Sequence, residues 1–288
     1  MSPRASKLLT LDEAAASVHD GDTLGLGGWI FYNTPMALVR ALVRAGRRRL
    51  TLVAAPGSIG PDLLLGADVV ARVFCVFITF EHLGLAPHFR RRAEKGELQV
   101  LEMDGPGLVA GLRASADGLP WVPIFDLGTD LPSVNPEWYR PLPAADGARL
   151  LAVPPIRPDV TFLHGQQADE HGNVQLFGAA FFDPLLAQAS GRVIVSVDRI
   201  VSNKVIRRTP ERTKLPSYLV QGVVECPGGA HPTGSHGRYD PDEGSLLEYV
   251  EESHEPAAFE SYLGRYVRVD ERRYRAVVGA RHPHRGRR

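Results

Sequence analysis

A glycine-dense turn near the N-terminus constrains the fold of this chain more than any other feature. Residues 23–29 read Thr-Leu-Gly-Leu-Gly-Gly-Trp, a short apolar run that passes directly into the turn. Thr34 and Pro35 then supply an N-cap and a first helical position, and leucine and valine recur on one face until Gly46. An apolar run at residues 50–54 predicts the next strand. This order predicts a right-handed βαβ unit with parallel strands.

The same alternation continues along the chain. Thr10 and Glu13 form a capping-box pattern that opens a helix before the turn. Further strands are expected at residues 73–78, 98–101, 150–153, 160–163 and 192–197. Because these strands are almost continuously apolar, the fold class is predicted to be α/β, an open and mostly parallel sheet with helices on both faces. Prolines and glycines become frequent from Leu119 to Pro143, so a long irregular region is expected around residues 119–147.

Composition excludes several classes of protein. Lys plus Arg and Asp plus Glu both number 33, so no net field would draw the chain to nucleic acid or to an anionic membrane. No apolar segment is long enough for a signal peptide or a bilayer span, and a cytoplasmic protein is therefore expected. Cys75 and Cys226 lie in apolar surroundings that are typical of buried, reduced thiols.

The glycine turn predicts a site for an oxyanion or a phosphate. Glycines let backbone N–H groups approach a ligand closely, and the helix start adds partial positive charge. Dinucleotide binding is disfavoured because its third glycine is replaced by Ile30, and because Arg47 to Leu50 occupy the place of the ribose-binding acid. A tight turn without chemistry is the alternative interpretation.

Acidic residues follow two of the predicted strands. The carboxyl ends of parallel strands are where ligands gather, so acids there are candidates for catalysis. Glu81 follows the strand at 73–78, and Glu102 and Asp104 follow the strand at 98–101. Asp104 precedes Gly-Pro and is better explained as a helix N-cap. Glu81 and Glu102 are weak catalytic candidates, and capping is the alternative for both.

Further candidates lie in the other turns. His164 and Gln166 follow the strand at 160–163, and Ser58 lies in the turn after the strand at 50–54; these three are the candidates for substrate binding. A hydrogen-bonded structural role is the alternative for His164. The segment 227–233 is a second glycine turn and a possible backbone concavity. His231 in this turn and His236 just after it are not accompanied by a cysteine or carboxylate at zinc-like spacing, so no metal site is predicted.

Short motifs follow one another in order along nearly the whole chain. They occupy residues 21–29 with Pro35, 80–87, 111–114, 118–120, 128–131, 158–160, 168–173 and 227–232. In this order they resemble the alpha (A) subunit of family I coenzyme A-transferases, the group that includes glutaconate and 3-oxoacid CoA-transferases. The resemblance implies an open α/β sheet and a single alpha-subunit domain over residues 1–288.

The resemblance also implies a mechanism. In that family an enzyme glutamate attacks an acyl-CoA thioester and forms an acyl-glutamyl anhydride, which CoA thiolate converts to a glutamyl-CoA thioester. The acceptor carboxylate then completes the exchange. This glutamate usually belongs to a beta subunit, so the implied partners are a beta subunit, an acyl-CoA and a small carboxylic acid, with no cofactor. By resemblance Gly27 and Gly28 line the oxyanion site, flanked by Gly25 and Trp29.

Two alternatives stand beside the transferase. A steroid-degradation branch of the same family hydrolyses a carbon–carbon bond in a cyclic CoA thioester and carries its acid on the alpha-like subunit. Residues 80–81, 102–104 and 227–231 resemble this branch. Its acid follows the aspartate, where this chain has Gly105, which leaves Glu102 as the nearest substitute. A non-catalytic acyl-CoA-binding scaffold is the third hypothesis, because no nucleophile is assignable in this chain.

Overall fold

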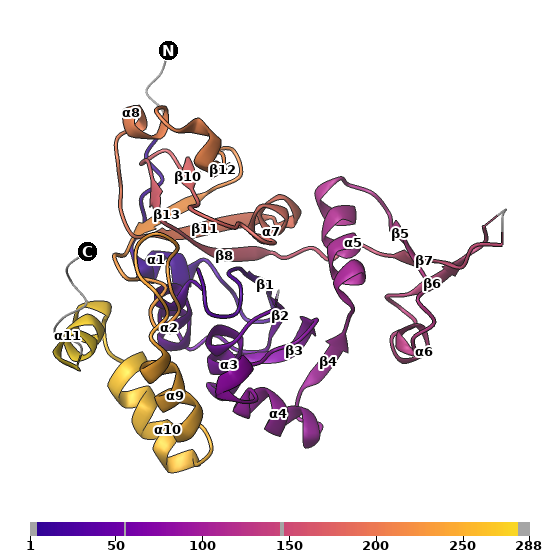
Figure 1. Ribbon diagram of the computed structural model, residues 1–288, viewed down its shortest axis with the longest axis horizontal. Coiled ribbons are helices and arrows are strands. Elements are labelled where there is room, and N and C mark those ends of the chain that lie inside the picture. Colours follow the sequence, from indigo (N-terminus) through magenta and orange to yellow (C-terminus); the bar gives the residue numbers. More distant parts are fainter. Residues whose placement is uncertain (1–4, 55, 145–146, 282–288) are drawn as a thin grey trace.

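The computed structural model describes residues 5–54, 56–144 and 147–281. Within these residues a sheet of seven parallel strands forms the centre of the molecule (Figure 1). In spatial order the strands are β13 (Gly222–Glu225), β11 (Arg192–Val197), β8 (Val160–Gly165), β1 (Thr23–Leu26), β2 (Leu50–Ala54), β3 (Val70–Cys75) and β4 (Gln99–Glu102). The open parallel sheet confirms the predicted fold class and puts β1, which leads into the glycine turn, at its centre.

Helices and two small antiparallel sheets surround the parallel sheet. The helices are α1 (Leu11–Ala16), α2 (Met36–Arg44), α3 (Ile59–Gly66), α4 (Pro87–Glu94), α5 (Gly105–Ala116), α6 (Leu131–Val134), α7 (Asp183–Ala189), α8 (Asn203–Ile206), α9 (Glu243–Glu252), α10 (Pro256–Tyr262) and α11 (Glu271–Arg281), with the short turns η1 (Glu81–Leu83), η2 (Pro210–Arg212) and η3 (Leu263–Val267). One small sheet contains β5 (Val122–Phe125), β7 (Leu150–Val153) and β6 (Arg140–Leu142). The other contains β12 (Thr213–Leu215), β10 (Val174–Gln175) and β9 (Gln167–Ala168). None of the helices in the described residues is long and apolar enough to cross a bilayer.

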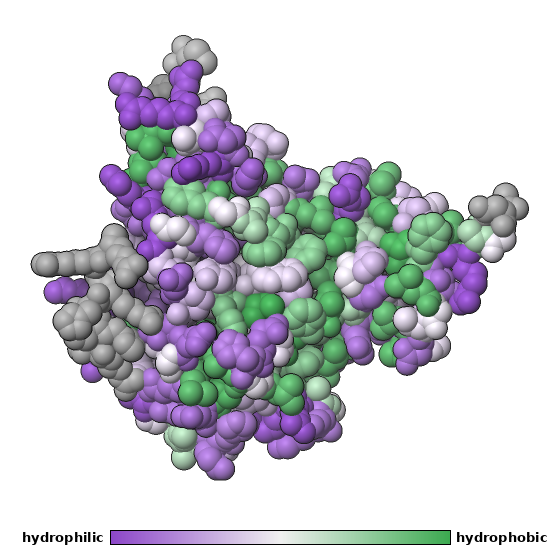
Figure 2. All heavy atoms as spheres, viewed as in Figure 1, coloured by the Kyte–Doolittle hydropathy of each residue, from purple (hydrophilic) through white to green (hydrophobic). Residues whose placement is uncertain are grey.

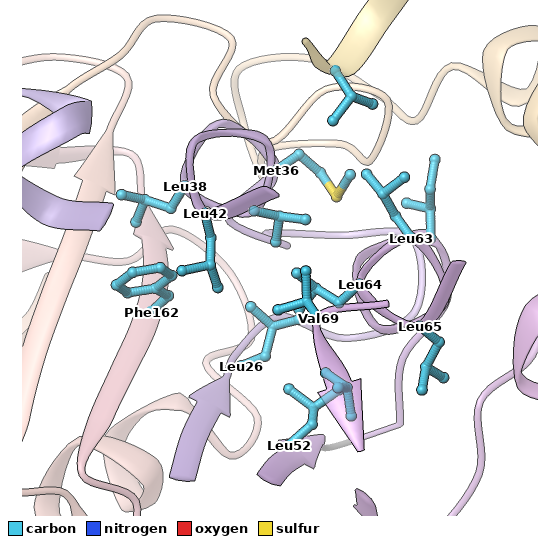
Figure 3. Packing of buried hydrophobic residues seen from close by; sticks show 14 of the residues in the cluster. Leu26, Met36, Leu38, Leu42, Leu52, Leu63, Leu64, Leu65, Val69 and Phe162 are labelled. Atoms are coloured by element: carbon cyan, nitrogen blue, oxygen red, sulfur yellow. The ribbon is translucent and has the colours of Figure 1, made fainter. Parts of the chain in front are cut away.

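Both faces of the parallel sheet are covered, because alternate residues of each strand point to opposite sides. Leu26 of β1 and Leu52 of β2 pack with leucines of α2 and α3, as Figure 3 shows. Val53 and Phe74 point to the opposite face of the sheet and belong to a second cluster with residues of α5 and α7. Each fully buried leucine stabilises the fold by about 2 kcal/mol. The predicted coverage by helices on both sides is therefore confirmed.

The helix starts agree with the sequence at α1 and differ at α2. Thr10 Oγ1 accepts the Glu13 N–H at 3.2 Å and the Glu13 carboxylate accepts the Thr10 N–H at 2.8 Å, which confirms the capping box. At α2 the prediction of Thr34 as N-cap is wrong. Pro35 occupies the cap position with ψ 62°, and no side chain caps the helix. The Met36 N–H instead donates to the Thr34 carbonyl at 2.8 Å, a tight local turn that replaces the side-chain cap.

The region around residues 119–147 is more regular than expected. It contains β5, α6 and β6, and with β7 these strands form an antiparallel sheet that projects beyond α5 as an arm (Figure 1). Pro123 and Pro141 lie on the two edge strands, where a residue without an N–H is tolerated. Proline frequency therefore indicated irregular structure wrongly, because it marked the edges of a small sheet. Residues 145 and 146 lie outside the described part.

Candidate functional site

The carboxyl ends of the parallel strands lie along one edge of the sheet, which is where ligands of such sheets bind. The glycine turn follows β1, Ser58 follows β2, and Glu81 lies in η1 after β3. Glu102 is the last residue of β4, and His164 belongs to the end of β8. All the sequence-predicted candidates thus share this edge, but their distances from the glycine turn differ.

The three glycines of the turn are required by packing. A Cβ on Gly25 would lie 2.1 Å from Thr161 Oγ1 of β8, and a Cβ on Gly27 would lie 2.2 Å from Leu163 Cδ2. Gly28 has φ +91°, a conformation that disfavours any side chain. Close contact between β1 and β8 and one left-handed residue therefore account for the glycines without any ligand.

The amides of the turn are already engaged, which corrects the predicted oxyanion site. The Gly27 N–H donates to the Phe162 carbonyl at 3.0 Å and the Trp29 N–H donates to the Tyr32 carbonyl at 2.8 Å. The Gly28 N–H donates to Asp183 Oδ1 at 2.9 Å. Gly25 lies in β1 and pairs within the sheet. These donors point into the protein because Gly27 extends the contact between β1 and β8 and residues 29–32 close a tight turn.

One amide of the turn is still available. The Ile30 N–H donates to the Pro56 carbonyl at 3.0 Å. Between Gly27 and Tyr32, only the Phe31 N–H has no hydrogen-bond partner among the described residues. Phe31 is partly exposed, so this N–H is the remaining backbone donor of the turn.

Asp183 is a buried acid that the sequence did not single out. The residue is 2% exposed, and burial raises the pKa of its carboxyl group to about 7 although the Gly28 N–H opposes the rise. The dipeptide Asp183-Pro184 indicated only the start of a helix. No local signal places this side chain against Gly28, because the two residues are 155 positions apart.

His164 and Ser58 hold loops in place instead of facing a ligand. His164 is fully buried, and its Nδ1 lies 3.0 Å from Ser196 Oγ while its Nε2 lies 3.4 Å from Asp198 Oδ2. Ser58 is also fully buried, and its hydroxyl donates to the Ile30 carbonyl at 2.5 Å. Neither side chain is accessible to a substrate, so the structural alternative holds for His164.

Gln166 connects three loops at the same edge and is likewise fully buried. Its Nε2 donates to Asn33 Oδ1 at 2.9 Å and to Ser235 Oγ at 3.0 Å. Its Oε1 accepts the Phe177 N–H at 2.6 Å, and the Ser235 hydroxyl donates to Asp198 at 2.6 Å. Every polar atom of the Gln166 side chain is therefore used internally, and its predicted contact with substrate is wrong in this structure.

Strained residues and aromatic rings surround the turn. Ile30, Asn33 and Phe181 have φ values of 47°, 57° and 45°, which are unusual for residues other than glycine. Such strain persists only where surrounding structure enforces it, and it concentrates at functional sites. Phe181 is 44% exposed and stacks on Trp29 with ring centroids 4.7 Å apart. The turn therefore presents aromatic surface, with Trp29 contributing its ring and not its amide.

The candidate acids Glu81 and Glu102 are exposed and differ in their distance from the turn. Glu81 has φ 52°, and neither its carboxylate nor that of Glu102 has a partner among the described residues. Strands are about 4.8 Å apart, so Glu102 at the end of β4 lies roughly 14 Å from β1. Glu81 lies in η1 next to His82, whose ring centroid is 6.1 Å from that of Phe31 in the turn. Asp104 accepts the Gly107 N–H at 2.8 Å and the Tyr139 hydroxyl at 2.9 Å, which confirms it as the N-cap of α5.

The second glycine turn, at residues 227–233, offers no open concavity. The Gly228 N–H donates to Asp198 Oδ1 at 2.9 Å, and the Ala230 N–H donates to the Tyr239 hydroxyl at 3.1 Å. His231 lies between Asp242, 3.1 Å from its Nε2, and Tyr274, 2.7 Å from its Nδ1. The part of the chain that the structure describes holds no cluster of three residues suited to a metal ion.

Known proteins resemble this chain over nearly its whole length. A family model for coenzyme A transferase matches residues 8–226. The cholesterol ring-cleaving hydrolase IpdA subunit of Rhodococcus jostii is 34% identical over 96% of this chain and 97% of its own length. The A-subunit of the 3-oxoadipate CoA-transferase of Pseudomonas knackmussii is 33% identical over 91% of this chain and 94% of its own. The crystal structure of glutaconate coenzyme A-transferase from Acidaminococcus fermentans matches with a TM-score of 0.90 and 29% identity, covering 96% of this chain and 94% of that one.

Proposed function

The chain belongs to the coenzyme A transferase family, and from this premise we propose that it is the alpha subunit of a heteromeric CoA-transferase. The enzyme would move CoA between an acyl-CoA and a free carboxylic acid, with residues 1–288 as one alpha-subunit domain. Both relatives described above are named as subunits, which supports a partner chain. One of these relatives is a hydrolase subunit and the other a transferase subunit, so experiment must decide which reaction this chain supports.

The observation that carries the proposal is the match to a transferase A-subunit over 91% of this chain. Two of the acids discussed above are remote or inaccessible: Glu102 ends β4, about 14 Å from β1, and Asp183 is buried beneath Gly28. Glu81, in η1, is exposed and nearer the turn, because the ring centroid of its neighbour His82 lies 6.1 Å from that of Phe31. The proposal assigns the nucleophilic carboxylate to the partner chain and not to Glu81.

In the proposed reaction the partner subunit supplies a glutamate. Its carboxylate attacks the thioester carbonyl, the C–S bond breaks, and an acyl-glutamyl anhydride and CoA thiolate result. The thiolate attacks the glutamyl carbonyl of the anhydride, which gives glutamyl-CoA and releases the acid. An acceptor carboxylate then attacks the glutamyl-CoA carbonyl, and the steps run in reverse to give the new acyl-CoA. Each attack builds negative charge on a carbonyl oxygen.

The proposed contribution of this chain is to bind and orient the thioester. Phe31 N–H is the donor of the turn that is left for the developing oxyanion, since the neighbouring amides are engaged. The stacked rings of Trp29 and Phe181 supply an apolar surface for the acyl group. This assignment replaces Gly27 and Gly28 as donors and keeps the turn at the reacting end of the substrate.

The projecting arm supports the proposal of a heteromer. Phe125 and Leu127 on this arm are 70% and 68% exposed, and Trp121 and Val134 are 44% and 60% exposed. Figure 2 shows hydrophobic surface over the arm. Clustered apolar surface of this kind on a soluble subunit is typical of a protein interface. Contact with the beta subunit would remove it from water.

A ring-opening acyl-CoA hydrolase is the second candidate function. It is supported by the hydrolase relative at 34% identity and by the unpartnered carboxylate of Glu102. Glu102 lies beside the start of α5, where Gly105 has open space around its Cα. In this case the acid would act on a part of the substrate distant from the glycine turn, and the partner's glutamate would not matter.

Kinetics of the assembled protein test the proposal. We would purify the chain with the product of its neighbouring gene and measure CoA transfer from acyl-CoA to a panel of labelled free acids. Transfer that is lost on substituting the partner's candidate glutamate, with that glutamate found as a CoA thioester by mass spectrometry, is the expected result. Water incorporation into a cyclic CoA ester without transfer would establish the hydrolase. CoA-ester binding without turnover would establish the scaffold.

A further inference from the structure

A strongly basic segment lies at the ligand edge of the sheet and is unused by the proposed function. Residues 199–214 follow β11 and hold six cations against the single acid Glu211. The six are Arg199, Lys204, Arg207, Arg208, Arg212 and Lys214, all exposed. None of them forms an ion pair within the described residues, although the chain as a whole is electrically neutral. Unpaired like charges at this density repel one another and favour an anionic ligand.

Two arginines from distant elements meet at one ring beside this segment. The guanidinium carbon of Arg212, from η2, lies 5.0 Å from the ring centroid of Phe177. That of Arg238, from the loop that follows β13, lies 5.4 Å from the same centroid. The Phe177 ring therefore positions both guanidinium groups through cation–π contacts. No acid among the described residues pairs with either, and Arg238 makes only contacts of 3.5 Å, to Gln166 O and Gln167 Oε1.

A continuous path leads from these arginines to the glycine turn. A Cβ on Gly237 would lie 3.6 Å from the Phe177 ring, and a Cβ on Gly178 would lie 3.1 Å from His236. His236 stacks on Tyr32 with ring centroids 4.3 Å apart. Phe181 lies 6.5 Å from His236 and stacks on Trp29. Cations thus stand at one end of a row of rings, and the turn stands at the other.

We propose that Arg212 and Arg238, positioned over Phe177, bind the phosphorylated nucleotide end of acyl-CoA. The proposal rests on the proposed function, which makes acyl-CoA the ligand. A guanidinium group donates two parallel hydrogen bonds to a phosphate and stays charged at every relevant pH. CoA carries its phosphates at one end and its thioester at the other. Its nucleotide at the arginines therefore directs the pantetheine arm along the rings and the thioester to the turn.

Equilibrium binding tests the nucleotide site directly. The wild-type heteromer and its Arg212→Gln and Arg238→Gln variants would be titrated with CoA, with adenosine 3′,5′-bisphosphate, and with inorganic phosphate. We expect each substitution to weaken CoA and the bisphosphate about tenfold, because a charged hydrogen bond to phosphate is lost. Inorganic phosphate should bind far more weakly than the bisphosphate. Wild-type affinity should fall with salt more steeply than that of the double variant.

A matched control separates local from general effects of charge. Arg90→Gln removes an exposed arginine of α4 that pairs with Glu94, and it should leave all affinities unchanged. Unchanged CoA affinity in the Arg212→Gln, Arg238→Gln double variant would overturn the proposal. Equal weakening by Arg90→Gln would also overturn it, because the effect would then reflect net charge alone.

Kinetics distinguish a failure of the nucleotide site from a failure of the proposed function. The KM of a CoA thioester should rise in the variants relative to that of the matching pantetheine thioester, which lacks the nucleotide. A parallel rise in both would reject the assignment to the nucleotide end. If the wild type transfers no CoA at all, the proposed function fails while the bisphosphate titration still decides the site. Phe177→Ala should weaken the bisphosphate as well, because it removes the ring that positions both arginines.

Discussion

Replacing Asp183 by asparagine is expected to stabilise the protein above neutral pH and to leave it nearly unchanged below about pH 4. Asp183 is 2% exposed, and its carboxyl group accepts the Gly28 N–H at 2.9 Å and has no cation against it in the described residues. An asparagine has almost the same shape and keeps the accepting oxygen. It differs mainly in being neutral at every pH, so the variant never places a negative charge in this buried position.

The magnitude follows from the pKa of Asp183, which burial raises from 3.8 to about 7. Between these values the folded protein keeps a proton that the unfolded chain has lost, so the free energy of unfolding falls as pH rises. The stabilising contribution is complete below about pH 4 and is lost by about pH 7. Each pH unit in the window is worth about 1.4 kcal/mol. From pH 5 to pH 8 the advantage of the variant should grow by about 3 kcal/mol, or about 5 °C in Tm.

Urea and thermal unfolding of both proteins at pH 5 and pH 8 measure this difference. Asp62, whose pKa burial raises to about 6, and His88, whose pKa burial lowers to about 3, also titrate. They are present in both proteins and cancel in the comparison. Asp68→Asn, at an aspartate with a 73% exposed side chain, is the control and should show no such growth. The reasoning would be refuted if the free energy of unfolding of Asp183→Asn differed from that of the wild type by the same amount at both pH values. A variant less stable than the wild type at pH 8 would refute it as well.

Three further substitutions test the site. Gly27→Ala should lower the free energy of unfolding by about 1–3 kcal/mol in urea titrations, because its Cβ would overlap Leu163; an unchanged midpoint would contradict the packing account. Glu102→Gln should change the rate of CoA transfer by less than about twofold, whereas loss of a general acid costs roughly a hundredfold or more. A loss of that size in steady-state kinetics would make Glu102 a catalytic residue and contradict the assignment of the nucleophile to the partner chain. Asp104→Ala should destabilise the protein by about 1 kcal/mol in thermal melts, because α5 loses its N-cap, and no change would argue against that role.

Local patterns predicted the parallel sheet because they report properties of neighbouring residues. The apolar run at 50–54 and the capping box at Thr10 depend on spacings of a few positions, and both were confirmed. The arm was missed for the same reason. Pro123 and Pro141 break local periodicity, and only their pairing with β7 shows that they occupy edge strands.

The candidate site was predicted less well because exposure is not a local property. His164 and Gln166 lie at the expected edge, yet both are fully buried. His164 is bonded to Ser196 of β11, and Gln166 to Asn33 and Ser235 of other loops. The pair formed by Arg212 and Arg238 over Phe177 had no sequence signal at all, since the three residues belong to separate segments.

The sequence by itself determined the N-terminal βαβ unit, the open α/β sheet and the edge at which a ligand would bind. These features depend on turn residues and hydrophobic periodicity, which are set by residues close together in the chain. The tertiary structure alone decided which donors at that edge are free. Gly28 loses its amide to Asp183, 155 positions away, and Gly27 loses its amide to Phe162. A hydrogen-bond donor serves one strong acceptor at a time, so its availability depends on which distant residues the fold brings against it.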